Sequence, residues 1–182
     1  IACLFISTAG VANRSTAAES PAACDPDGAL QFVCGPLNAE DLVRIGDSRW
    51  LVASGMDGAL TGAGAARGHL YLIDHRSKSW QVAFPGASPA FRHDKKSFGD
   101  CPGPLNVANF SAHGIAIRQQ SRGRPRLYVV GHGDREAIEV FEVDARGATP
   151  SLAWIGCVVL PDDVSANSVA ILPDWGFVTT KF

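Results

Sequence analysis

Apolar residues in this chain gather in short runs that come in pairs, and a polar or glycine-containing turn joins each pair. The more continuously apolar pairs cover residues 42–45 with 49–54, 115–117 with 127–130, and 169–172 with 177–180. Short β-branched and aromatic runs bounded by turn residues predict strands, and neighbouring runs predict antiparallel hairpins. No segment has a helical period of useful length, so the pattern predicts an all-β fold.

A second, more amphipathic kind of hairpin follows each of the first two pairs. These hairpins cover residues 69–74 with 79–84, and 138–143 with 152–155. The run 138–143 alternates apolar and charged residues, as a half-exposed strand does, whereas the first set is typical of strands buried on both faces. An inner apolar hairpin followed by an outer amphipathic one makes a four-stranded sheet, and its repetition predicts the blades of a β-propeller.

The number of repeats predicts a partial propeller of about two and a half blades. Two complete repeats cover about residues 41–84 and 113–160, and the inner half of a third ends at residue 182. A propeller closes around its axis with at least about four blades. We therefore expect a fragment, in which residues 24–182 are the N-terminal part of a propeller domain that is incomplete at its C-terminus.

The first residues have the composition of an export signal. Residues 1–12 are apolar and end in small side chains, and residues 13–21 are polar and rich in alanine. This pattern predicts that residues 1–23 are a truncated secretory signal peptide with a polar leader, which makes the protein secreted or periplasmic. The run is too short for a membrane span. A buried N-terminal strand is the alternative, and a lipoprotein signal at Cys3 is disfavoured because apolar residues follow it directly.

The charge and the cysteine content limit the kinds of partner and metal that the sequence favours. The formal net charge is −2 and no run of Lys or Arg occurs, which argues against nucleic acid or an anionic membrane as the main partner. Beyond Cys3, the chain has Cys24, Cys34, Cys101 and Cys157, with no Cys-x-x-Cys motif and no nearby histidine pair, so zinc is disfavoured. In an oxidising compartment these thiols predict one or two disulfides, and sequence alone leaves three pairings open if all are used.

Candidate chemistry emerges when the inner strands are superposed on their first apolar residues, which are Leu42, Ile115 and Val169. Two positions earlier stand Glu40, His113 and Asn167. Inner strands of a propeller run side by side around a channel, so these side chains are expected to meet at one mouth, and His132 follows a returning strand at the same mouth. Each residue also has a structural interpretation, as a turn residue or a hydrogen-bonded histidine. The shared repeat position favours a site.

Several short motifs resemble those of paraoxonases and arylesterases. They are Asn38-Ala-Glu-Asp-Leu42, Ala112-His-Gly-Ile115, Val129-Val-Gly-His132 followed by Ile138-Glu-Val-Phe141, and Ala166-Asn-Ser-Val169. The motifs occur in the family's order, over about residues 35–182. That family belongs to the six-bladed β-propeller superfamily that also contains gluconolactonases and strictosidine synthase-like proteins. The resemblance implies the same fold here.

The resemblance also implies a set of site residues. Glu40 and Asn167 match ligands of the family's catalytic calcium, and Asp41 and the carbonyl of Ile115 match ligands of a second, structural calcium. His113 and His132 match the family's proposed histidine dyad. Ser168 departs from the pattern, because the animal enzymes carry an acidic ligand there, and this puts the second calcium in doubt.

The leading hypothesis is a calcium-dependent hydrolase of small-molecule lactones or aryl esters. Ca²⁺ would polarise the carbonyl, His113 would take a proton from the attacking water, and His132 would support it. The main alternative is a non-catalytic, calcium-stabilised propeller that binds a small ligand or a protein, since one fold hosts both kinds. A lyase or condensing activity of the strictosidine synthase type would not call for this full set of calcium and histidine residues.

Overall fold

The computed structural model describes residues 25–56, 68–120, 123–174 and 176–181. The predicted signal peptide and leader at residues 1–23 lie outside this part of the chain. The described residues contain strands, turns and irregular segments and no helix, which confirms the all-β prediction. No helix with the length and apolar character of a membrane span is found among them.

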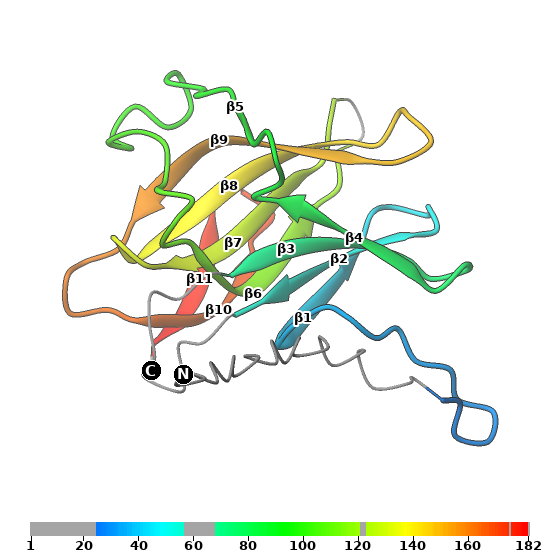
Figure 1. Ribbon diagram of the computed structural model, residues 1–182. Coiled ribbons are helices and arrows are strands. Elements are labelled where there is room, and N and C mark those ends of the chain that lie inside the picture. The colour runs from blue at the N-terminus through cyan, green and yellow to red at the C-terminus, as the bar shows by residue number, and fades with distance from the viewer. Residues whose placement is uncertain (1–24, 57–67, 121–122, 175, 182) are drawn as a thin grey trace, which may run out of the picture.

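The strands form three separate sheets (Figure 1). The first sheet is antiparallel, in the order β1 (Ala39–Arg44), β2 (Trp50–Gly55), β3 (His69–Asp74) and β4 (Ser79–Phe84). The second has the order β5 (Ala90–Phe91), β9 (Ser151–Val159), β8 (Ala137–Asp144), β7 (Arg126–His132) and β6 (Ser111–Arg118). The third is the hairpin of β10 (Ala166–Ile171) and β11 (Phe177–Lys181). All five predicted hairpins are present and antiparallel.

One strand was not predicted. Residues 85–104 have the composition of a loop, yet Ala90 and Phe91 pair in parallel with Ala153 and Trp154 of β9. This short strand covers the outer edge of β9, which would otherwise present unpaired N–H and C=O groups to a neighbouring chain. Each of the three sheets is open, so the arrangement of the sheets as propeller blades stays a prediction.

Apolar packing holds the sheets face to face. Side chains of the first and second sheets share a core that includes Val52, Leu72, Phe84, Phe141 and Trp154. A second cluster, between the second and third sheets, includes Tyr128, Val130, Ile138, Val140 and Val169. The inner strands β1, β6 and β10 therefore lie next to one another, with β6 in the middle. This order brings the first residues of the three inner strands together.

The expectation that the strands of the inner hairpins are buried on both faces is wrong for β1, β10 and β11. Strands β6 and β7 are largely buried, whereas Leu42 of β1 is 55% exposed and Val178 of β11 is 52% exposed. The physical reason is position, because β6 and β7 have a packed sheet on either side. Strands β1, β10 and β11 lie at the two outer sides of the described layers.

A disulfide joins Cys101 to Cys157 and so selects one of the pairings that the sequence left open. It fastens the segment before β6 to β9, at a sequence separation of 56 residues. Cys34 is also disulfide-bonded. The prediction of one or two disulfides is therefore confirmed for the described cysteines.

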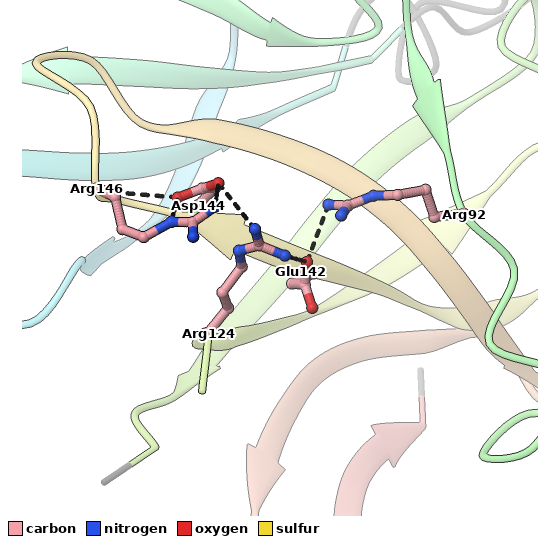
Figure 2. A network of polar contacts seen from close by, with 5 residues as sticks. All are labelled: Arg92, Arg124, Glu142, Asp144 and Arg146. Carbon is pink, nitrogen blue, oxygen red and sulfur yellow. Dashed lines mark hydrogen bonds and ion pairs between the residues drawn. The ribbon is translucent and has the colours of Figure 1, made fainter. Parts of the chain in front are cut away.

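A network of charged side chains lies at the C-terminal end of β8 (Figure 2). Its members are Arg92, Arg124, Glu142, Asp144 and Arg146. Arg124 bridges the two acids, at 2.7 Å from Glu142 Oε1 and 3.2 Å from Asp144 Oδ2. The hydrogen bond from Arg146 holds the pKa of Asp144 well below its usual range. Because these charges satisfy one another, the network ties β8 to its neighbours rather than presenting a site.

Candidate functional site

Each inner hairpin is interrupted by a β-bulge at the predicted site positions. The pairing skips Glu40 in β1, His113 and Gly114 in β6, and Asn167 and Ser168 in β10. A bulge leaves its extra residue without a cross-strand partner and changes the direction of the side chain, and bulges are frequent beside active sites. The repeat position found in the sequence therefore corresponds to a repeated backbone irregularity.

Strands β1 and β6 are joined by two neighbouring acidic residues. Glu40 Oε1 lies 2.9 Å from His113 Nε2, and the His113 side chain is only 4% exposed whereas that of Glu40 is 42% exposed. Asp41 Oδ2 accepts a hydrogen bond of 2.9 Å from the backbone N–H of Ile115. The carboxylate of Glu40 thus contacts an imidazole, whereas that of Asp41 accepts a backbone N–H that the bulge in β6 leaves without a cross-strand partner.

Strands β6 and β10 approach closely at Gly114. A Cβ atom at this glycine would lie 2.5 Å from the carbonyl oxygen of Asn167 and 2.6 Å from Cα of Ser168. Only glycine permits this backbone contact. It places Asn167 beside the residue that follows His113. The Asn167 carboxamide has no hydrogen-bond partner in the part of the chain that the structure describes.

A continuous chain of side-chain contacts runs from Glu40 through two histidines to a second glutamate. His113 Nδ1 and His132 Nε2 are 3.0 Å apart, and His132 Nδ1 lies 2.8 Å from both carboxylate oxygens of Glu136. His132 is the last residue of β7, and Glu136 lies in the loop that leads to β8. The predicted residues Glu40, His113 and His132 are therefore brought together.

Glu136 was missed by the sequence reasoning, which searched only for positions shared between repeats. A signal was present, because Glu136 stands four residues after His132. The ends of β7 and β8 pair at Gly131 and Ala137, so a short hairpin loop returns the chain to His132. An acidic residue just before the returning strand is then within reach of the histidine that ends the first strand.

Hydrogen-bond accounting gives the number of protons that the chain of contacts needs. An ionised carboxylate is an acceptor only, so Glu40 and Glu136 must each receive an N–H from the imidazole that they touch. The contact between the rings needs one more N–H, and a neutral imidazole carries only one. All contacts are satisfied when the histidine pair holds one additional proton, so that a positive charge lies between two carboxylates.

The residues predicted to bind calcium are of the right chemical type, but there are few of them. The carboxylate of Glu40 and the carboxamide of Asn167 are oxygen donors at neighbouring bulges, and Ca²⁺ takes about six to eight oxygen ligands. Among the described residues, no group of three or more His, Cys, Asp or Glu side chains could hold a metal ion. The catalytic calcium position therefore stays a prediction, with two donors assigned in this chain.

Asp41, the acidic residue predicted to bind the second calcium, already accepts two backbone hydrogen bonds. Asp41 Oδ1 accepts the backbone N–H of Leu42 at 2.8 Å, and Oδ2 accepts that of Ile115. Ser168 contributes no charge, and its backbone N–H and C=O are bound by hydroxyl groups of β11. Asp41 is accounted for as a hydrogen-bond acceptor, and the ligand roles of Asp41 and Ile115 stay predictions.

A small cavity of about 160 Å³ borders the dyad at His132. Its walls come from the segment before β6 and from the β7–β8 loop, and they include Leu105, Asn106, Asn109, Phe110, Asp134 and Arg135. Both segments lie at the end of the second sheet where β6 begins and β7 ends. His132 thus borders a partly polar space, whereas His113 does not line it.

Comparison with known proteins adds no relative to this picture. No protein-family model matches the chain, and no curated protein matches it either. The resemblance carried by the short motifs and the geometry of the site are therefore the grounds on which a function is proposed.

Proposed function

We propose that this chain carries part of the catalytic site of a calcium-dependent hydrolase of lactones or aryl esters, built on a β-propeller of the paraoxonase type. The observation that carries the proposal is the contact chain from Glu40 through His113 and His132 to Glu136. A pair of hydrogen-bonded imidazoles with a carboxylate at each end is suited to accepting and sharing a proton. Ordinary core positions would carry aliphatic side chains instead.

His113 is the residue that acts as general base. When the pair holds two protons, with Nδ1–H of His113 donated to His132, Nε2 carries a lone pair, and a water molecule has to displace Glu40 Oε1, 2.9 Å away, to reach it. The proton that Nε2 takes from that water completes the set of hydrogen bonds, because Glu40 then accepts the new N–H. The positive charge formed in this step is stabilised by Glu40 and Glu136.

Calcium would supply the electrophilic half of the reaction, since a bound Ca²⁺ polarises a lactone or ester carbonyl and stabilises the oxyanion that forms. Glu40 and Asn167 would hold it, because both are oxygen donors at the bulges on either side of β6. Glu40 would thus connect the two halves of the site, with one oxygen near His113 Nε2 and the other available to an ion.

A second candidate function is a non-catalytic propeller that binds a small ligand or a protein and is stabilised by calcium. The observation in its favour is Asp41, both of whose carboxylate oxygens accept backbone N–H groups of β1 and β6. Acidic residues at this mouth therefore have a role in holding the inner strands together. That role does not call for the hydrogen-bonded histidine pair, which is why hydrolysis is preferred.

The test is hydrolysis of a panel of lactones and aryl esters by the purified protein, with and without a calcium chelator. We expect turnover of at least one substrate class that is lost with chelator and restored by added Ca²⁺. A protein that binds Ca²⁺ and gains thermal stability from it, yet hydrolyses nothing in the panel, would support the non-catalytic alternative. Turnover that is unaffected by chelator would contradict the calcium requirement.

A further inference from the structure

The β7–β8 loop that carries Glu136 is fixed at each of its residues. Gly133 has φ +130° and lies so close to the backbone of Asn109 that a Cβ atom would clash with its carbonyl oxygen. Asp134 accepts hydrogen bonds from the carboxamides of Asn109 and Asn106, and these bonds lower its pKa. A loop with so many fixed contacts can hold a side chain in one orientation.

Arg135 anchors the same loop in the core. Its guanidinium makes a bidentate ion pair with Glu139, at 2.8 and 3.1 Å, and donates to the carbonyl of Gly103 at 3.0 Å. Glu139 is 2% exposed and also accepts a hydrogen bond of 2.6 Å from Trp154 Nε1. A buried carboxylate with these partners has no freedom to move. The loop is therefore tied to β8 and β9 and to the segment before β6.

The backbone of Glu136 is hydrogen-bonded, and its side chain points toward His132. Its carbonyl accepts the N–H of Leu160 at 2.9 Å, and both oxygens of its carboxylate lie 2.8 Å from His132 Nδ1. An ionised carboxylate can only accept, so Nδ1 of His132 must carry the proton. In the neutral ring, Nε2 is then the acceptor, and it faces His113 Nδ1 at 3.0 Å.

We infer that Glu136 is a positioning residue that sets the direction of hydrogen bonding through the histidine pair. With His132 fixed as the Nδ1–H tautomer, its Nε2 accepts the Nδ1–H of His113, so that the additional proton of the pair is held on His113 Nε2 and received by Glu40. Without Glu136, His132 can rotate or exchange tautomers, and His113 Nε2 is no longer the defined base. The inference rests on the proposed function for its catalytic consequence, but the tautomer of His132 does not depend on that function.

The experiment combines nitrogen NMR of ¹⁵N-histidine-labelled protein with steady-state kinetics. In the unaltered protein we expect His132 as the Nδ1–H form with a hydrogen-bonded proton signal. Glu136→Ala should lose this signal and lower kcat by at least about 10–100-fold, the cost of removing the hydrogen-bond partner that orients a metal-ligating histidine, while KM stays the same. Glu136→Gln keeps an acceptor oxygen, so it should keep the tautomer and recover part of kcat.

The matched control is Asp163→Asn, which removes a negative charge at an exposed residue outside this loop, where the carboxylate is paired with Lys181. We expect it to keep the Nδ1–H form of His132. An unchanged His132 signal and an unchanged kcat in Glu136→Ala would overturn the inference. Loss of the signal in Glu136→Ala, in a protein that hydrolyses none of the tested esters, would support the inference and contradict the proposed function.

Discussion

At the start of β1, two consecutive acidic residues turn to different partners. Glu40 contacts the ring of His113, and Asp41 binds the backbone of Leu42 and Ile115. In the proposed function, removing the charge of Glu40 changes a side chain that would serve both an ion and a base. Removing the imidazole of His113 would change the base and leave the oxygen donors in place. This difference allows the two roles to be separated.

At the residue scale, Glu40→Gln should weaken calcium binding and, through it, lower turnover, because a neutral carboxamide is a poorer ligand than a carboxylate. His113→Gln should lower kcat by about 10²–10⁴-fold, the usual contribution of a general base, with little change in calcium affinity. Calorimetric titration with Ca²⁺ and kcat at saturating Ca²⁺ measure the two effects. Full turnover by His113→Gln at saturating Ca²⁺ would show that His113 is not the base.

At the element scale, the three bulges satisfy their backbone groups in two ways. In the first and third sheets, a hydroxyl group on the returning strand accepts the N–H that the bulge leaves unpaired. Ser54 accepts the N–H of Asp41 at 3.2 Å, and Thr180 accepts the N–H of Ser168 at 3.0 Å. In β6 the N–H of Ile115 is bound instead by Asp41 of the neighbouring strand. The central bulge is thus stabilised between sheets, and its geometry depends on how closely the inner strands approach.

Gly114→Ala tests that close approach between β6 and β10. The added methyl group would meet backbone atoms of Asn167 and Ser168 at 2.5–2.6 Å, and neither can move without shifting β10. We expect a loss of about 1–3 kcal/mol in the free energy of unfolding, as for other overpacked sites, measured by urea denaturation. The control is Gly86→Ala, which should be near neutral because no atom lies within 4 Å of the point where its added methyl group would stand. Equal stability of the two variants would contradict the contact between β6 and β10.

At the scale of the whole molecule, the described sheets are held by shared apolar cores and by covalent and polar ties at their ends. The Cys101–Cys157 disulfide and the bonds of Asn106 and Asn109 to Asp134 fix the segment before β6. The charged network around Glu142 and Asp144 fixes the opposite end of β8 (Figure 2). The second sheet is therefore held at both ends of β8.

Replacement of both Cys101 and Cys157 by Ala should lower the free energy of unfolding by about 2–4 kcal/mol. The reason is that a cross-link between distant residues restricts the unfolded chain, and these cysteines are 56 residues apart. Urea denaturation measures the change. A double variant with an unchanged unfolding midpoint would contradict a stabilising role for this disulfide.

The repeated pattern of apolar and polar positions was enough to predict the strands, their antiparallel hairpins and the common position of Glu40, His113 and Asn167. These features are local or periodic, because strand alternation and turn residues depend on neighbours in the sequence. Only the tertiary structure decided that β5 pairs with β9, that Cys101 binds Cys157, and that Glu136 orients toward His132. Each of these joins residues through a loop or a packed sheet, where the backbone path sets the contact and no sequence period records it.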